Sequence, residues 1–418
     1  MPSRLRLSSA ATAIETAAYP LGFGRKCGYH LRVTKFDSPA ISASELSQVS
    51  ESYREDIVRI RRHLHSHPEL SRCENRTASF VAAELERLGI EHQDGFGIPN
   101  AIRAIIHGAA LPDEAGTGDR ERVVALRADM DALPIQEATG LPFASTVPGV
   151  MHACGHDAHM AMLLGAARIL QTLKKRWCGR VILLFQPAEE RAPGGALDMI
   201  RAGALENPRP DLIIGQHVNP ELPAGTFGFR PGTMMASVDD FFITITGSGG
   251  HGAMPHLCVD PIAITAQIIT SLQLLVSRMA DPQLPTVLSF GKIIGDGAAN
   301  IIPGSVRIEG TFRSIDEAWR AEALKRIVRI ITMTAEAHGA TATVDIVNGY
   351  PILVNDERLT AELKQRAAGL VGSGNVGNLG LFMGAEDFAY YGKQVPACFY
   401  NIGVGKAGTW NPPLHHPG

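Results

Sequence analysis

Apolar residues along the chain follow two patterns, a helical spacing in some segments and short unbroken runs in others. Apolar residues three and four positions apart share one helix face, so the first pattern predicts helices. Ser52 and Ser314 each precede a glutamate by three residues, which is typical of a capping box, and Asp157 is placed to cap a third helix. The predicted helices are residues 52–67, 77–88, 158–170, 194–202, 261–279 and 314–339.

Three apolar runs are interpreted as buried strands that end in polar residues. These runs and the polar residues that follow them are 123–126 with Asp129, 181–185 with Glu189 and Glu190, and 212–214 with His217. Helices are predicted between consecutive strands, which favours a mostly parallel sheet. Ligands bind at the carboxyl ends of the strands in such sheets. The sequence therefore predicts an α/β fold with its chemistry at that edge.

The pattern changes after Gly232, where two strand–helix units follow each other. Their strands are predicted at residues 241–246, 287–290 and 305–311. These units predict a smaller α+β domain inserted into the first domain. We therefore expect three parts: a flexible N-terminal extension at 1–50, a main domain at 51–232 and 348–418, and an inserted domain at 233–347.

Residues 1–44 contain few acids, several Arg and Lys, and many Ser and Ala. A transit peptide has a similar composition, and so does upstream sequence without a function. We favour the second interpretation.

Composition limits the partners and the compartment. The 418 residues carry a formal net charge of -3 with 19% charged residues, so we expect no nucleic-acid partner. No apolar run approaches the ~18 residues that span a bilayer, so we expect no membrane segment. The six cysteines form no CxxC pair, which favours a reducing compartment, and we expect the cytoplasm.

The stretch from Met151 to His159 contains one thiol, three imidazoles and one carboxylate. A thiolate and a neutral imidazole are good zinc ligands, so Cys154 and His156 are candidate metal ligands. A single Cys is also a common small buried hydrophobe, and a single His is often a hydrogen-bonded structural residue. From this stretch alone both interpretations stay open.

Glu189 and Glu190 follow a predicted interior strand. Adjacent carboxylates at a surface often have no role beyond solvation. In a partly dry site they repel each other unless a cation compensates. One could then bind a metal while the other acts as a base. His217 is a candidate further ligand, and taken alone it is equally well a structural residue.

Taken together, seven motifs in one order resemble a known family. They are Met-His-Ala-Cys-Gly-His-Asp, Gln-Pro-Ala-Glu-Glu, Gly-Gln-His, Gly-Gly-His-Gly-Ala-Met-Pro-His, Ala-Asn-Ile-Ile-Pro, Gly-Ala-Glu-Asp-Phe and Leu-His-His-Pro. From Ile57 to the last residue the chain resembles the dinuclear metal amidohydrolases, which include hippurate hydrolase, bacterial N-acyl-amino-acid amidohydrolases and plant auxin-conjugate hydrolases. The resemblance implies a metallopeptidase-like catalytic, metal-binding domain and an inserted dimerisation or lid domain.

The resemblance also implies roles for individual residues. The ligands of two divalent ions would be Cys154, His156, Glu190, His217 and His415, with Cys154 as the bridge. Glu189 would be the general base, and Asp129 would support a metal-bound imidazole. We expect zinc or manganese, with nickel and cobalt as alternatives.

The implied substrate is a small N-acyl amino acid, either hippurate-like or N-acetyl, that is cleaved to a carboxylic acid and an amino acid. Asn300 and Arg313 would contact the carboxylate of the amino acid, for which an Arg fork is suited. His251 would reach across a homodimer, formed through the inserted domain, to stabilise the oxyanion in the partner's site. A tetramer is an alternative assembly.

The resemblance leaves alternative activities open, and the chain departs from the family pattern near its end. N-acetyl-diaminopimelate deacetylases and N-carbamoyl-amino-acid hydrolases belong to the same family, so either activity is an alternative. A non-catalytic binding protein of this fold and a thiol oxidoreductase using Cys154 are more distant ones. Relatives usually continue past the last ligand, so we expect His415 to be weakly held if Gly418 ends the natural chain.

Overall fold

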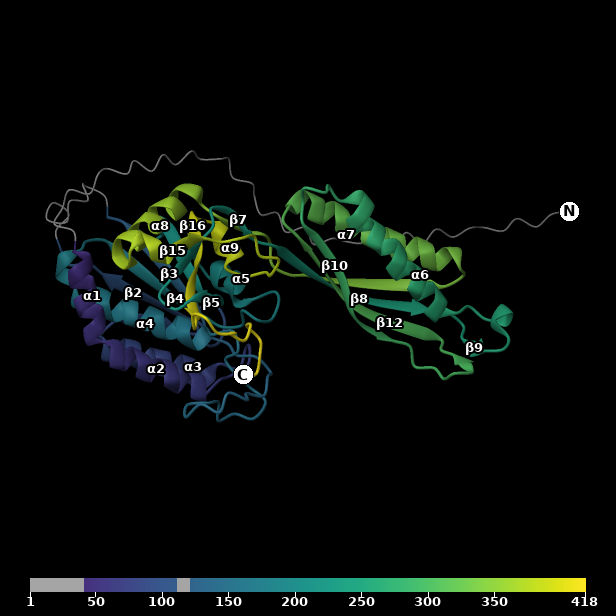
Figure 1. Ribbon diagram of the computed structural model, residues 1–418, viewed down its shortest axis with the longest axis horizontal. Helices are drawn as coiled ribbons and strands as arrows, with labels where there is room; N and C mark the ends of the chain where they lie inside the picture. Colours follow the sequence, from purple (N-terminus) through teal and green to yellow (C-terminus); the bar gives the residue numbers. More distant parts are fainter. Residues whose placement is uncertain (1–40, 111–120) are drawn as a thin grey trace. The chain divides into compact units, whose positions relative to one another are not determined.

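The computed structural model describes residues 41–110 and 121–418, so the predictions for residues 1–40 lie outside the described residues. The main sheet has eight strands, and its central strands run parallel (Figure 1). β3 pairs in parallel with β4 and β5, and β5 pairs in parallel with β16. In sheet order the strands are β1 (Glu91–Asp94), β2 (Ile102–His107), β4 (Arg180–Gln186), β3 (Val123–Asp129), β5 (Leu212–Pro223), β16 (Ala397–Gly405), β6 (Phe227–Phe229) and β15 (Val376–Asn378). The predicted mostly parallel α/β fold is confirmed.

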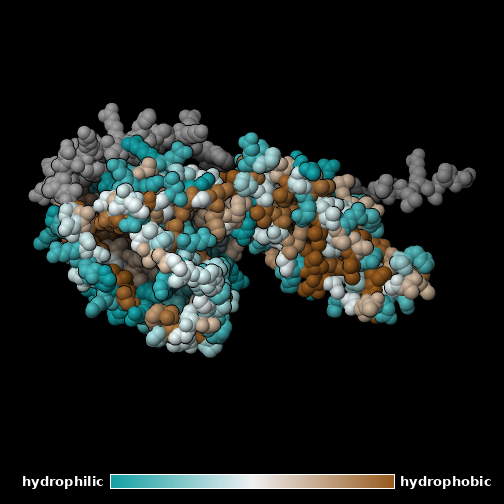
Figure 2. Space-filling model, viewed as in Figure 1, coloured by the Kyte–Doolittle hydropathy of each residue, from teal (hydrophilic) through white to brown (hydrophobic). Residues whose placement is uncertain are grey.

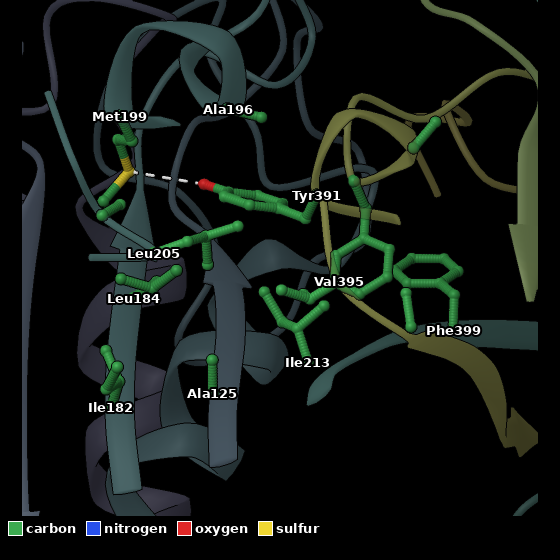
Figure 3. Close-up of a cluster of buried hydrophobic side chains, with 14 of the residues drawn as sticks. Ala125, Ile182, Leu184, Ala196, Met199, Leu205, Ile213, Tyr391, Val395 and Phe399 are labelled. Carbon is green, nitrogen blue, oxygen red and sulfur yellow. Dashed lines mark hydrogen bonds between the residues drawn. The ribbon is translucent and has the colours of Figure 1, made fainter. Parts of the chain in front are cut away.

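Alternate residues of β4 enter hydrophobic clusters on opposite faces of the sheet, because side chains alternate along a strand. Val181, Leu183 and Phe185 pack in one cluster, whereas Ile182 and Leu184 pack in the other (Figure 3). Each such Val, Leu, Ile or Phe contributes roughly 1.5–3 kcal/mol by burial. The first cluster contains α2 (Arg54–Ser66), α3 (Asn75–Arg87) and α4 (His156–Thr172), and the second contains α5 (Gly195–Arg201) and α9 (Ala389–Gly392).

The start of regular structure differs from the prediction. Helix α1 (Ala43–Ser52) begins at Ala43, capped by the side chain of Ser42, which accepts a hydrogen bond from the backbone N–H of Glu45. Ser52 is the last residue of this helix, and its hydroxyl donates to the carbonyl of Val49. The predicted capping box at Ser52 is therefore wrong, and regular structure begins nearer the N-terminus than predicted.

The other two predicted caps are also wrong in detail. Helix α4 begins at His156 after Gly155, whose φ of 83° makes the turn, so Asp157 lies inside the helix and caps nothing. At the later helix Asp316, rather than Ser314, accepts the hydrogen bond from a backbone N–H of the first turn.

A second sheet is antiparallel throughout, in the order β10 (Thr286–Ile294), β12 (Ser305–Ser314), β8 (Ser237–Thr246), β13 (Thr341–Asn348). A separate hydrophobic cluster joins it to α6 (Pro261–Leu274), the π-helix η3 (Leu275–Met279) and α7 (Glu317–Ala337). The remaining elements are β7 (Gly232–Met235) paired with β14 (Leu353–Asn355), β9 (Gly250–His251) paired with β11 (Ile301–Ile302), α8 (Glu357–Val371), η1 (Lys174–Arg176), η2 (Pro255–Leu257) and η4 (Ser373–Asn375).

One helical stretch among the described residues, Pro261–Met279, is long and apolar enough to cross a membrane by length and composition. No unbroken apolar run in this stretch approaches 18 residues, so it meets the criterion only through the mean hydropathy of the whole stretch. Ile264 and Ile268 of this stretch are buried in the cluster against the antiparallel sheet, as in the core helix of a folded domain. Hydrophobic side chains also reach the surface of the part of the chain that carries the antiparallel sheet (Figure 2). Phe242 of β8 and Ile293 of β10 are among the exposed ones.

Candidate metal centre

The five residues predicted as metal ligands come from separate segments that meet at one end of the parallel strands. Glu190 follows β4, and His217 lies within β5. Cys154 and His156 flank Gly155 at the start of α4, where the positive φ of this glycine turns the chain. Polar residues that directly follow buried strands were therefore a correct indication of the site, because parallel strands bring such residues to one edge of the sheet.

Distances between possible ligand atoms show how closely these side chains converge. The sulfur of Cys154 lies 3.3 Å from Nε2 of His217 and 3.3 Å from Nε2 of His415. Oε1 of Glu190 lies 3.4 Å from Nε2 of His415 and 3.8 Å from Nε2 of His156. Within this cluster Cys154, His156 and His217 form one possible ligand group, and Cys154, Glu190 and His415 form another. Cys154 is common to both groups.

The cluster fits divalent cations on chemical grounds. Nε2 of His156 and Oε1 of Glu190 are buried, and neither finds a hydrogen-bond partner among the described residues. Buried polar atoms are normally satisfied, so these two atoms need an explanation, which a shared cation would give. Burial, and then the negative charges of Glu190 and Glu189, raises the pKa of the Cys154 thiol well above its ordinary value. A bound cation reverses that effect, because it stabilises the thiolate.

Backbone carbonyls orient two of the imidazoles toward the cluster. Nδ1 of His217 donates to the carbonyl of Val218 at 2.7 Å, and Nδ1 of His156 donates to the carbonyl of Asp131 at 2.9 Å. Each ring therefore presents Nε2 to the cluster. Burial lowers the pKa of His217 to about 3, which keeps it neutral. Burial also opposes protonation of His156, but the carboxylates of Asp129, Asp131 and Glu190 outweigh it and raise its pKa to about 10.

His415 is held in place although it lies near the end of the sequence. Its backbone N–H donates to the carbonyl of Ala153 at 2.9 Å, one residue before Cys154. The carbonyl of Pro417 accepts a hydrogen bond from the N–H of Ala138 at 2.6 Å. Backbone bonds on both sides of the imidazole thus fix this segment to the loop that carries the thiol.

Glu189 lies beside the possible ligands, and hydrogen bonds to its backbone hold it there. The two carboxylate oxygens of Asp131 accept the N–H groups of Glu189 and Glu190, each at 3.0 Å. The hydroxyl of Tyr350 donates to the carbonyl of Glu189. Burial, followed by the charge of Glu386, raises the pKa of the Glu189 carboxyl well above its ordinary value. A carboxyl with a raised pKa next to a cation site is suited to proton transfer.

Comparison with known proteins covers this same part of the chain. The family described as peptidase family M20/M25/M40 matches residues 125–417, which include the whole cluster. The chain belongs to peptidase family M20/M25/M40. Among its relatives, the N-acyl-L-amino acid amidohydrolase of Geobacillus stearothermophilus is 44% identical over 76% of this chain and 83% of its own. The N-acetyl-L-cysteine deacetylase of Bacillus subtilis is 40% identical over 86% of this chain and 82% of its own.

A solved structure of this family addresses the metal content. The Bacillus subtilis YXEP protein, described as a dinuclear metal binding peptidase from the M20 family, is 35% identical with a TM-score of 0.71. The similarity covers 88% of this chain and 92% of that one. This likeness and the two ligand groups that share Cys154 support two metal ions in the present M20-family chain.

The sequence interpretation missed a buried ionic network behind the M20 site. The guanidinium of Arg127 donates to Asp129 at 2.6 Å, to Glu386 at 3.0 Å and to Asp387 at 2.7 Å. Oδ1 of Asp129 in turn lies 2.6 Å from Nδ1 of His159. Asp129, which we expected to support a metal-bound imidazole, is hydrogen-bonded to His159, which was not among the predicted ligands. Its Oδ2 also lies 3.7 Å from Nε2 of His156, which was among them. The Arg127-Ala-Asp-Met-Asp run and the Glu386–Asp387 pair were visible in the sequence, whereas their pairing was not.

The predicted substrate contacts lie in the part of the chain that carries the antiparallel sheet. His251 and Asn300 are exposed, and they are neighbours because the N–H of Gly252 donates to the carbonyl of Asn300 at 2.8 Å. Arg313 lies in β12, and its guanidinium donates to the carbonyl of Met383 at 3.3 Å. Met383 lies three residues before Glu386, so this arginine contacts the segment that leads to the buried carboxylates.

Proposed function

We propose that this protein is a metal-dependent amidohydrolase that cleaves the amide bond of N-acyl amino acids to a carboxylic acid and an amino acid. The observation that carries the proposal is the convergence of Cys154, His156, Glu190, His217 and His415 beside the carboxyl of Glu189. The names of the 40–44% identical relatives, an N-acyl-amino-acid amidohydrolase and an N-acetyl-cysteine deacetylase, support the substrate class.

The chemistry assigns two successive tasks to Glu189. Two divalent ions, when bound by the five ligands, polarise the amide carbonyl and lower the pKa of water. Glu189 then accepts the proton of the attacking water and delivers it to the leaving nitrogen, so it acts first as a base and then as an acid. Its orientation for this transfer comes from Asp131 and Tyr350, which hold its backbone on either side. We propose zinc or manganese as the working ion.

The inserted domain, which we place at residues 233–347, would supply the remaining parts. Arg313 and Asn300 would bind the carboxylate of the amino acid. His251 would stabilise the oxyanion in the site of a partner subunit, which requires a homodimer through this domain. Exposed hydrophobic side chains here, such as Phe242, support an assembly surface, because contiguous apolar patches often mark one. The scattered cysteines, which form no CxxC pair, favour a reducing compartment, and we propose the cytoplasm.

A substrate panel tests the proposed function. Hippurate, N-acetyl amino acids and indole-acetyl conjugates are each supplied with zinc, manganese, nickel or cobalt, and amino-acid release is measured. N-acetyl-diaminopimelate and N-carbamoyl amino acids serve as competing candidates. We expect metal-dependent release from the first group that a chelator abolishes. No release from any N-acyl amino acid with any ion would refute the proposal.

The assignment of the base has its own test. Glu189→Ala should keep two metal ions per chain and lose about 10²–10⁴-fold in kcat, because proton transfer contributes that much. Glu221→Ala, at an exposed position on β5, is the matched control and should keep its activity. Near wild-type turnover by Glu189→Ala would show that another group transfers the proton.

A further inference from the structure

His159 is a fully buried residue of α4 for which neither the sequence nor the proposed mechanism gives a role. Its Nε2 lies 3.0 Å from the backbone N–H of Val218 and accepts that hydrogen bond. An acceptor nitrogen carries no proton, so the proton lies on Nδ1 and is donated to Asp129 at 2.6 Å. Both ring nitrogens are therefore used, and no lone pair of His159 remains for a metal.

The contacts of His159 continue into the buried network. Asp129 is held between His159 and the guanidinium of Arg127, and all three side chains are buried. Hydrogen bonds to charged groups are among the strongest in proteins, and in a dry interior they have few alternatives. Arg127 also contacts Glu386 and Asp387, which are the carboxylates next to Glu189. His159 is thus held by a buried ionic network whose carboxylates Glu386 and Asp387 lie next to the proposed base, Glu189.

On its other side, His159 meets the backbone of a proposed ligand. Val218 directly follows His217, and its N–H is the group that His159 accepts. The carbonyl of Val218 accepts the Nδ1 proton of His217 and thereby sets which nitrogen of His217 is available. The two imidazole rings also touch, with centroids 4.7 Å apart and planes at 69°. A shift of His159 would therefore move both the backbone and the ring of His217.

We propose that His159 is a positioning residue that, anchored by Asp129 and Arg127, holds the Val218 amide and thereby aims Nε2 of His217 at one of the two metal ions. The proposal deepens the proposed function, since it rests on the same metal centre. Partners of metal-binding imidazoles that act from outside the ligand set change metal affinity by about 10–100-fold when removed. His159 does not contact the metal-binding nitrogen of His217 and acts through the backbone N–H of Val218.

The chain offers a matched control for this test. His152 is also buried and lies two residues before Cys154 in the same loop, but neither of its ring nitrogens has a hydrogen-bond partner among the described residues. His159→Phe and His152→Phe therefore make the same chemical change, and only the first removes two hydrogen bonds. Zinc affinity is measured in both full-length variants by competition with a chromophoric chelator, together with the number of ions per chain.

We expect His159→Phe to bind one of its two zinc ions about 10–100-fold more weakly than the wild type, whereas His152→Phe keeps both affinities. A folded His159→Phe with wild-type affinity at both sites overturns the proposal. So does an equal loss in both variants, since that would reflect packing alone. Wild-type protein that binds both ions but hydrolyses no amide would refute the proposed function, and the affinity comparison would still decide the role of His159.

A measurement on the wild type covers the case in which His159→Phe does not fold. Long-range nitrogen–proton NMR spectra of the zinc-loaded, histidine-labelled protein report which ring nitrogen carries the proton. We expect His159 in the Nδ1–H form, because its Nε2 accepts the Val218 amide. An Nε2–H form would break the contact with Val218 and overturn the proposal.

Discussion

Gly155, between Cys154 and His156, gives the sharpest test of what sets the backbone conformation between these two proposed ligands. Its φ of +83° lies in the left-handed region, and a Cβ added there would lie 2.4 Å from Cγ2 of Val218. Gly225 has nearly the same φ, +84°, but a Cβ there meets nothing within 4 Å. The two glycines therefore share the conformational cost of an alanine and differ only in the steric clash.

The expected costs follow from these two terms. An alanine in the left-handed region costs about 1–2 kcal/mol, which is the whole effect for Gly225→Ala. Overpacking against Val218 adds about 1–3 kcal/mol, so Gly155→Ala should cost about 2–5 kcal/mol. In a Val218→Ala background the clashing methyl group is gone, and Gly155→Ala should then cost only about as much as Gly225→Ala.

The assay is urea unfolding of the metal-saturated protein, followed by the circular dichroism of its helices. Zinc affinity is measured in parallel, because the clash moves the backbone between two ligands. We expect Gly155→Ala to lower both stability and affinity, and Gly225→Ala to lower stability slightly and leave affinity unchanged. Equal destabilisation by the two alanines, or no recovery in the Val218→Ala background, would refute the reasoning.

Three further predictions concern other parts of the chain. Cys154→Ser removes the soft ligand, so chelator competition should show a larger loss of zinc affinity than of manganese affinity; equal losses would contradict a shared thiolate. Burial lowers the pKa of His65, but the Asp157 carboxylate outweighs this and raises it above 6.5. The pair with Asp157 therefore stabilises the protein fully below about pH 6.5, and this stabilisation is lost as pH rises through the folded pKa of His65. The melting temperature of the wild type should exceed that of His65→Phe by an amount that shrinks from about pH 6 to pH 9, and a constant difference would contradict this. Arg320→Met leaves the buried Asp239 carboxylate without its ion-pair partner, so the free energy of unfolding measured in urea should fall by about 3–5 kcal/mol. A decrease below about 1 kcal/mol would contradict this.

The central sheet could be predicted from the sequence because its strands are short apolar runs with polar ends. Strand β4 is buried on both faces of the sheet, with Leu183 on one face and Leu184 on the other, so its sequence lacks the alternation of a half-exposed strand. Helix starts were predicted less well, since local rules compete. Asp157 is a good capping residue by type, but it lies inside α4, where it pairs with His65 and Arg61, while Gly155 makes the turn. Local pattern gives no sign of such distant partners.

The ligand types could be anticipated, whereas the network behind them could not. His159 precedes Met160 on the helix and has the spacing of a core residue, so periodicity alone suggests packing. Its role depends on Asp129 and Val218, which lie in different strands. Arg127 and Glu386 are separated by 259 positions, and only the fold brings them together. Sequence patterns identify chemistry best where the residues are neighbours, and contacts across the sheet need the structure.

Anomalous X-ray diffraction from crystals grown with zinc tests the central claim most directly. The account predicts two zinc peaks that share the sulfur of Cys154, one with His156 or His217 and the other with Glu190 or His415, and a Glu189 carboxylate that binds neither ion. A single peak, a pair of peaks that does not share Cys154, or a Glu189 oxygen bound to an ion would contradict it.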